Sequence, residues 1–250
     1  TLVAGAGSCS IAIPNVGSRT ITATYAGDAN YDGSSDTEDH TVNLADTTTT
    51  ITSDIPDPSL VGESVEVSFT VAADAPGSGT PTGDVTVTVD GSAATCSDTL
   101  VAGAGSCTLA IPNAGARTLT ATYAGDTNYN GSSDTEAHTV GLSDTTTTIT
   151  SDTPDPSLVG ELVEVSFTVV SDPPGGVAPT GDVTVTVDGS AATCSDTLMA
   201  GAGSCTLAIP NAGARTLTAT YAGDDIYTGS NDTEAHTVIF TLFVPYVVTD

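Results

Sequence analysis

The chain has 250 residues, and 31 acidic residues against three arginines give it a formal net charge of −28 at pH 7. So few cations leave nothing to neutralise phosphates, which argues against a nucleic-acid partner. The same charge disfavours docking on anionic lipid. No run of 18 apolar residues is present, so we expect no membrane insertion within this segment. No signal peptide is recognisable at the start, so an export signal would lie upstream of Thr1.

Internal repetition is the first feature met along the chain. The N-terminal segment TLVAGAGSC, residues 1–9, is repeated at 99–107 and, with one substitution, at 197–205. Each copy ends in a cysteine, and the interval between copies is constant at 98 residues. A repeat of this length has the size of a domain and exceeds the repeats of solenoid proteins.

The repeat divides the chain into a partial unit (1–44), a middle unit (45–142) and a third unit (143–238). The partial unit matches only the C-terminal half of the two complete units, and its Cys9 has no upstream cysteine to pair with. We therefore expect the sequence to be an excerpt from a longer array. The alternative is a processed terminus that leaves Cys9 unpaired as a free thiol.

Short strands follow one another through the middle unit. The run TTTTIT opens it, and residues 64–71 then alternate strictly between apolar and polar side chains, which is the period of a half-buried strand. A strand at 84–89 ends at the turn pair Asp90–Gly91. Glycine, proline, asparagine and aspartate separate the further strands, which we expect at 107–112, 117–123 and 136–140.

About seven such strands in 98 residues, without helical periodicity, predict an all-β fold. Two packed antiparallel sheets, a β-sandwich, are the natural arrangement for each complete unit. Aromatic residues are scarce, and the expected core holds only Phe69, Tyr123 and Tyr129 among them. The connection HTVGLSDTTTT between units is short and limits swivelling, so we expect tandem sandwiches arranged as an extended rod.

Each complete unit contains two cysteines eleven residues apart, on sequential segments that could form a hairpin. The repeated spacing predicts disulfide bonds, which would stabilise a small core and favour an extracytoplasmic setting. Separately buried, reduced thiols are the alternative. The pairs are Cys96 with Cys107 and Cys194 with Cys205.

The sequence resembles the bacterial immunoglobulin-like repeats found in tandem in large secreted and surface proteins. The resemblance is carried by RTLTATYAGDTNYNGSS (117–133), TTTTITSD and PTGDVTVTVDG, and it covers the chain to about Val238. The third unit departs from it at Ile226, where the other units have asparagine. The resemblance implies an Ig-like sandwich with a spacer or adhesive role and implies no catalytic site. The hallmarks of antibody domains are missing, because there is no tryptophan and we expect the cysteines to be too close in sequence to bridge opposite sheets.

The stretch DANYDGSSD, residues 28–36, copies the start of a calcium-binding loop. The pattern fails at Ala137 of the middle unit and at Ile226 of the third unit, so we interpret the stretch as a hairpin loop with Asx turns. Calcium between units is a second interpretation, with ligands near Asp46, Asp54 and Asp57, although their spacing is unspecific. We therefore assign no cofactor and no metal site, with calcium as the alternative.

One histidine occurs in each unit, at His40, His138 and His236. A lone histidine in a strand such as EAHTV is usually half exposed, and no partner ligands can be found from the sequence. The motif GxSxG is absent and no serine has an identifiable base and acid, so we expect no catalytic residues and no enzyme.

The segment 239–250 breaks the repeat with a dense apolar run that contains Pro245. It could be a terminal strand that caps the array or the start of a next segment, or it could be donated to a neighbouring molecule.

Three functions follow from the sequence. The first is a non-catalytic stalk or spacer of a bacterial secreted or cell-surface protein. The second is a subunit of an extracellular filament, built from copies of itself or neighbouring repeats through strand or end-to-end contacts. The third is an adhesive module that binds glycans or another cell.

Overall fold

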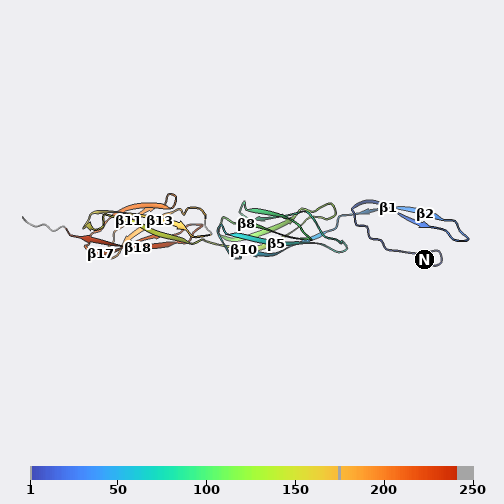
Figure 1. The fold of residues 1–250 in the computed structure, drawn as a ribbon, viewed down its shortest axis with the longest axis horizontal. Coiled ribbons are helices and arrows are strands. Elements are labelled where there is room, and N and C mark those ends of the chain that lie inside the picture. Colours follow the sequence, from blue (N-terminus) through green and yellow to red (C-terminus); the bar gives the residue numbers. More distant parts are fainter. Residues whose placement is uncertain (1, 174–175, 241–250) are drawn as a thin grey trace, which may run out of the picture.

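The protein, seen in a computed structural model that describes residues 2–173 and 176–240, is a row of three bodies built from strands and loops (Figure 1). The described residues contain no helix. Two complete sandwiches occupy the middle and third units, and the partial unit is a two-stranded hairpin with an N-terminal extension. The predicted all-β fold of tandem sandwiches is confirmed.

The strands of the partial and middle units follow in chain order. They are β1 (Gly17–Tyr25), β2 (Ser34–Val42), β3 (Thr47–Ile55), β4 (Ser59–Leu60), β5 (Ser64–Ala73), β6 (Asp84–Val89), β7 (Thr95–Thr99), β8 (Ala104–Ala110), β9 (Gly115–Tyr123) and β10 (Ser132–Gly141). The third unit repeats the middle one. Its strands are β11 (Thr145–Thr153), β12 (Ser157–Leu158), β13 (Leu162–Ser171), β14 (Asp182–Val187), β15 (Thr193–Thr197), β16 (Ala202–Ala208), β17 (Gly213–Tyr221) and β18 (Ser230–Ile239).

Each complete unit contains a five-stranded and a three-stranded sheet. In the middle unit the strand orders are β4-β10-β9-β6-β7 and β3-β5-β8, and the third unit has the same topology. The short strand β4 was not predicted, and it runs parallel to β10 in an otherwise antiparallel sheet. Its two residues are too few for a periodic pattern, which is why the sequence indicated about seven strands where the structure has eight.

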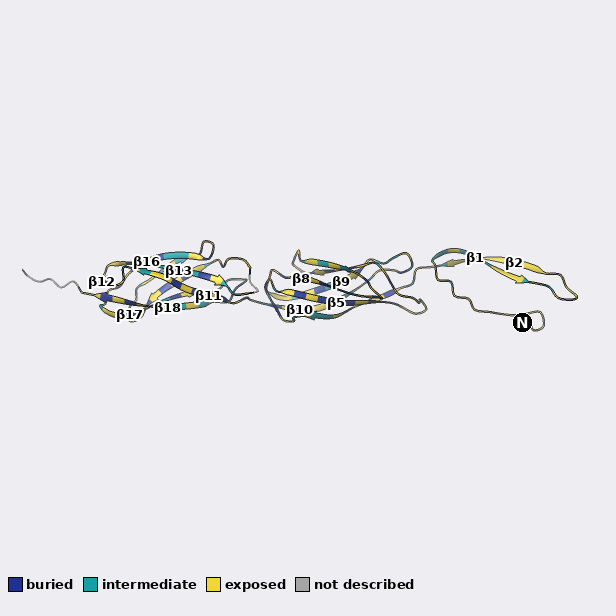
Figure 2. Ribbon diagram, viewed as in Figure 1, coloured by how far each residue is buried: buried dark blue, intermediate teal, exposed yellow. Residues whose placement is uncertain are grey.

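The core lies between the two sheets and follows the predicted alternation. Val65, Val67 and Phe69 of β5 are fully buried, and the residues between them are exposed or half-buried. Figure 2 shows this alternation of buried and exposed positions along β5. Val85 and Val87 of β6 meet them from the other sheet. Burial on one face of each strand is therefore what fixes the register, since a shift by one residue would expose every core side chain.

The two sheets are joined along both of their long edges. On one side, a disulfide bond links Cys96 of β7 to Cys107 of β8, and Cys194 of β15 is bonded to Cys205 of β16 in the same way. Because β7 and β8 belong to different sheets, each bond crosses the sandwich. The expectation that the cysteines are too close in sequence to bridge opposite sheets was therefore wrong. A tight turn, closed by Val101 and Ala104, carries the chain from one sheet to the other within a few residues.

The opposite edge is closed by side chains. Asp134 of β10 accepts a hydrogen bond of 2.8 Å from the backbone N–H of Ile51 in β3, next to a bulge in that strand. The hydroxyl groups of Thr47 and Thr49 face Ser132 at 2.8 and 2.7 Å. The outer edges of β3 and β10 thus satisfy each other, which limits pairing with a further strand.

Candidate functional site

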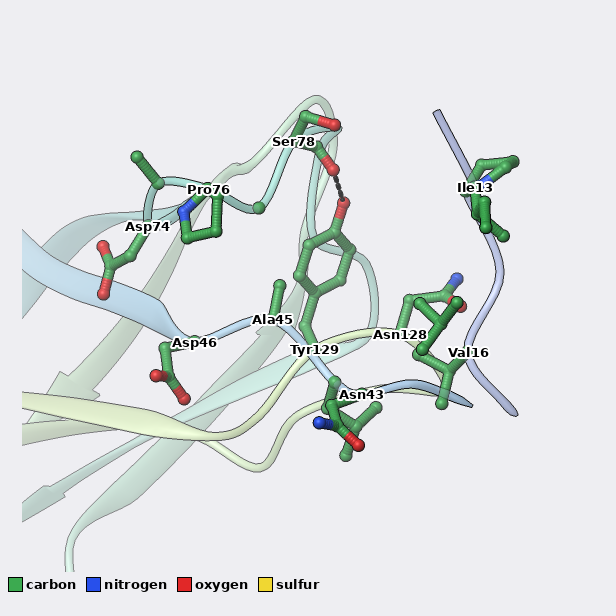
Figure 3. Close-up of a pocket in the computed structure, with 15 residues that line it drawn as sticks. Ile13, Val16, Asn43, Ala45, Asp46, Asp74, Pro76, Ser78, Asn128 and Tyr129 are labelled. Atoms are coloured by element: carbon green, nitrogen blue, oxygen red, sulfur yellow. Dashed lines mark hydrogen bonds between the residues drawn. The ribbon is translucent and has the colours of Figure 1, made fainter. Parts of the chain in front are cut away.

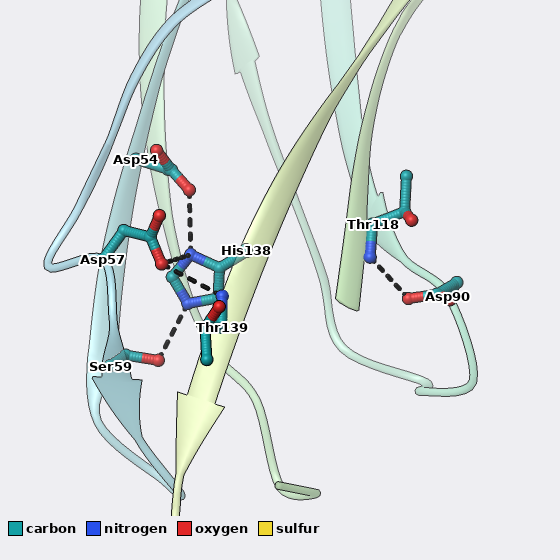
Figure 4. A network of polar contacts seen from close by, with 7 residues as sticks. All are labelled: Asp54, Asp57, Ser59, Asp90, Thr118, His138 and Thr139. Carbon is teal, nitrogen blue, oxygen red and sulfur yellow. Dashed lines mark hydrogen bonds and ion pairs between the residues drawn. The ribbon is translucent and has the colours of Figure 1, made fainter. Parts of the chain in front are cut away.

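A polar cluster lies buried at the start of the strand β4 in each complete unit (Figure 4). His138 of β10 points between the sheets and is 1% exposed. Its Nδ1 lies 2.8 Å from Oδ2 of Asp54 and 3.5 Å from Oδ1 of Asp57, and its Nε2 lies 2.8 Å from the hydroxyl oxygen of Ser59. Asp57 also accepts a bond from the backbone N–H of Thr139.

The third unit repeats this cluster. Nδ1 of His236 lies 2.7 Å from Asp152 and 3.6 Å from Asp155, and Nε2 lies 2.8 Å from Ser157. His40 of the partial unit is exposed. The expectation that these histidines are half exposed was therefore wrong for His138 and His236, because β4 and the loop before it cover the ring.

Sequence reasoning missed the partners of the histidines. Asp54 and Asp57 lie more than 80 residues before His138. Asp54 is in β3, which lies against β10, and Asp57 is in the loop before β4, a strand that was not predicted. A signal was available, since the motif with both aspartates, SD-x-PDPS, recurs in the third unit at the same interval as the histidine. The acids had instead been weighed as calcium ligands between units.

Ser59, His138 and Asp54 are linked by hydrogen bonds in the same order as the residues of a hydrolytic triad. The cluster is nevertheless not arranged for nucleophilic attack. Ser59 is 1% exposed, so its hydroxyl oxygen lies inside the sandwich, where a substrate carbonyl has no access. The cluster instead connects the end of β3, the strand β4 and β10. It ties the end of β3 and the adjoining strand β4 to β10, which is distant from both in sequence.

The stretch compared with a calcium loop, residues 28–36, spans the β1–β2 connection, and its copy in the middle unit forms the β9–β10 connection. The first aspartate of each copy is occupied by the chain itself, and Asp28 accepts the backbone N–H groups of Asn30 and Tyr31. Oδ1 of Asp126 accepts the backbone N–H groups of Asn128 and Tyr129, and Oδ2 accepts the hydroxyl group and N–H of Thr82. Burial would raise the pKa of Asp126, but these hydrogen bonds outweigh it and hold the pKa below its ordinary value. The carboxylate therefore acts as an anchor for an Asx turn.

The same connection closes the end of the sandwich through its tyrosines. Tyr129 is buried and its hydroxyl group donates to the carbonyl oxygen of Ser78. Tyr123 donates to the carbonyl oxygen of Thr82, and burial, followed by the nearby charge of Asp126, raises its pKa to about 12. These rings serve the core and present no open face.

A pocket of about 370 Å³ lies where the partial unit meets the middle unit (Figure 3). Ile13 and Val16 line it from the partial unit, and Ala45, Asn128 and Tyr129 line it from the middle unit. Asn128 stands at its edge and offers an amide toward the apolar side chains opposite. The pocket contains no cluster of groups suited to catalysis among its lining residues.

The joint between the middle and third units is packed differently. Ile226 stands at the position of Asn128 and packs against the cores of both units. Ser143 stands at the position of Ala45, is fully buried, and donates a hydrogen bond of 3.0 Å to the carbonyl oxygen of Val61 across the joint. The partial unit contains no counterpart of Val61, so the two joints differ in the partners offered to these positions as well as in the two residues.

A family profile described as "Bacterial Ig-like domain (group 3)" matches residues 47–141 and again 147–239. The chain belongs to this family. Both matches fall on the complete units, and each spans a sandwich from its first to its last strand. No curated protein matches the chain.

Among solved structures, the Ig-like chain is similar to the one entitled "Crystal structure of invasin: a bacterial integrin-binding protein", at 16% identity and a TM-score of 0.50. The match covers 78% of this chain and 39% of that one. It is also similar to the adhesin InvE of Yersinia pseudotuberculosis, at 14% identity and a TM-score of 0.40, over 75% of this chain and 58% of that one. The Ig-like chain thus corresponds to less than two thirds of either structure.

The family match assigns the two complete units to bacterial Ig-like domains, and the similarity to the invasin structure concerns the fold alone. No helix suited to spanning a membrane was found in the part of the chain that the structure describes.

Proposed function

We propose that this Ig-like chain is a non-catalytic stalk segment that spaces and orients other parts of a bacterial secreted or cell-surface protein. The observation that carries the proposal is the bonded joint between two complete sandwiches. The strand β10 ends at Gly141 and β11 begins at Thr145, so three residues connect the units. Within them, Ser143 bonds back to the preceding unit. A connection this short and this well bonded transmits orientation from one unit to the next.

The placement of the ends supports the same role. Each unit begins and ends at opposite ends of its sandwich, so that repeats extend along one line (Figure 1). Strands of about ten residues rise roughly 3.3 Å per residue, so each unit adds about 30 Å of reach. The charge of −28 keeps neighbouring stalks apart and in solution.

Small-angle X-ray scattering on the whole chain tests this proposal. We expect a particle several times longer than it is wide, and deletion of residues 45–142 should shorten it by about 30 Å or slightly more. A compact particle, or a deletion that leaves the maximum dimension unchanged, would contradict a spacer role.

A second candidate is lateral adhesion between copies of the chain, which corresponds to the filament hypothesis. The turn between β7 and β8 of the middle unit, and the corresponding turns of the other two units, each carry an exposed apolar residue. Val3 and Val101 are 77% exposed, and Met199 is 82% exposed. Their repetition along the row offers a series of apolar contacts. Replacement of Val101 and Met199 by serine should abolish concentration-dependent association in sedimentation experiments, and association that persists would exclude this surface.

Strand donation is a less favoured route to a filament, because the long edges of both sheets are closed by the disulfide bond and by Asp134. Most of the tail 239–250, for which a capping strand, a next segment or a donated strand was predicted, lies outside the described residues, since these end at 240. Glycan adhesion through the Asn128–Tyr129 loop is also less favoured, since Tyr129 is buried and offers no ring face for stacking on a sugar. The proposal includes export of the chain to the cell surface or to the extracellular medium.

A further inference from the structure

The histidine cluster has the geometry of a metal site as well as of a hydrogen-bonded tie. The ligand atoms of Asp54, Asp57 and His138 all lie within 4.8 Å of one another, and the same holds for Asp152, Asp155 and His236. Two ligands about 2.1 Å from a common ion are about 3.0 Å apart in octahedral and about 3.4 Å apart in tetrahedral coordination. The distances from Nδ1 to the carboxylates, 2.8 and 3.5 Å in the middle unit, span these values.

We propose that each complete unit binds one divalent transition-metal ion, such as zinc, through the histidine Nδ1 and the two carboxylates. One imidazole and two carboxylates form a donor set suited to first-row transition ions. Calcium prefers an all-oxygen environment, so the imidazole argues against it. Three protein ligands leave further coordination positions for water.

The surroundings of the ring favour this use. The hydroxyl group of Ser59 lies within hydrogen-bond distance of Nε2. This bond fixes the orientation of the ring in which Nδ1 points toward the carboxylates. When the ion binds, the hydrogen bond from Nδ1 to Asp54 is replaced by a coordination bond. In a neutral ring the proton then resides on Nε2 and is donated to Ser59, so the proton count of the ring is unchanged.

Access and charge support binding from solvent. The side chain of Asp57 is 38% exposed and that of Asp54 is 12% exposed, so a path from the surface reaches the buried ring along the carboxylates. The net charge of −28 raises the local concentration of cations. A bound ion would fix the end of β3 and the loop before β4 onto β10 in both units.

Isothermal titration of the whole chain with zinc chloride tests the proposal. The protein carries the substitution Cys9→Ser, so that the exposed free thiol does not bind the metal. We expect saturation at two zinc ions per chain, at one ion for Asp57→Asn, and no saturable binding for Asp57→Asn combined with Asp155→Asn. Asparagine keeps an oxygen that can accept the N–H of Thr139, so the fold should survive, which circular dichroism checks. Asp32→Asn in the exposed loop of the partial unit is the matched control and should leave the stoichiometry at two.

A second measurement needs no variant of the cluster. In a histidine-labelled chain, zinc should shift the Nδ1 resonances of His138 and His236 and leave that of His40 in place. The proposal is overturned if zinc does not saturate, if the asparagine variants bind as many ions as the parent, or if His40 responds as the buried histidines do.

Discussion

Aspartate serves this molecule as an acceptor for backbone N–H groups. Asp126 holds the β9–β10 connection, Asp134 closes the edge of the sandwich, and Asp90 accepts the N–H of Thr118 at 2.7 Å (Figure 4). The acidic composition of the chain is therefore partly structural. Threonine behaves similarly, since Thr47 and Thr49 of the TTTT run are buried and bond across the edge, while Thr48 and Thr50 face outward.

The hydrogen bonds to Asp126 give its contribution to stability a defined pH dependence. Its folded pKa lies below the unfolded value of about 4, so the contribution is present above that pH and is lost as pH falls through the folded value. Asp126→Asn should cost about 1 kcal/mol in unfolding free energy at pH 7 and clearly less near pH 3. Urea unfolding at both values measures this. Glu136→Gln removes the same charge from an exposed strand position and should show no such difference; an equal loss at both pH values would contradict the assignment.

The repeat provides an internal comparison for one buried hydroxyl group. Tyr123 donates to the carbonyl oxygen of Thr82 at 2.8 Å, whereas the hydroxyl of its counterpart Tyr221 is buried without a hydrogen-bond partner in the described part of the chain. Tyr123→Phe should therefore destabilise the middle unit by about 1 kcal/mol, and Tyr221→Phe should leave the third unit unchanged or slightly more stable. Hydrogen exchange resolved by peptide distinguishes the units. Equal effects in both units would show that the hydroxyl of Tyr221 is satisfied after all.

At the scale of elements, the strands that could be predicted were those whose sequence alternates between apolar and polar residues. The alternation of residues 64–71 predicted β5 and its buried face, because a half-buried strand needs one apolar side chain in every two. The strand β4 and the passage of the chain from β7 to β8 have no such pattern. Both features depend on which of the two sheets a segment joins, and this is decided by the packing of the whole sandwich rather than by the local sequence. The repeated motif with Asp54 and Asp57 is visible in the sequence, but its position beside His138 depends on the same arrangement of the sheets.

The disulfide between β7 and β8 joins two sheets that otherwise meet there only through packing and the bond from the N–H of Ser106 to Asp98. Removing a cross-link over eleven residues should destabilise a unit by about 3 kcal/mol in the chain-entropy model. Cys96→Ala with Cys107→Ala should therefore lower the melting temperature of the middle unit and leave the third unit as a reference within the same chain.

The oxidation state itself is checked by labelling. Under denaturing conditions, one of the five cysteines, Cys9, should react with iodoacetamide before reduction, and all five should react after it. Labelling of all five without reductant would mean that the pairs are reduced, buried thiols and would remove the argument for cross-linked sheets.

At the scale of the whole molecule, the joints decide whether a row of sandwiches behaves as a rod or as a flexible chain. The linear arrangement could be anticipated from the short connection between units. The sealing of the second joint could not, because Ser143 and Ile226 make their contacts with the neighbouring unit. The departure of Ile226 from the repeat is visible in the sequence. The structure explains it, because Ile226 lies at a joint and packs against the cores of both units.

Ile226→Asn should loosen the sealed joint, because it replaces an apolar contact with both cores by an amide that has no partner there. Spin labels on Thr50 of the middle unit and Thr148 of the third unit, both exposed in strands, report the motion by pulsed electron resonance. The distance distribution should widen in the variant while the melting temperature of each unit changes little. If Ile226→Asn leaves the width unchanged, the stiffness of the row resides in the connecting backbone, and the packing at position 226 does not control it.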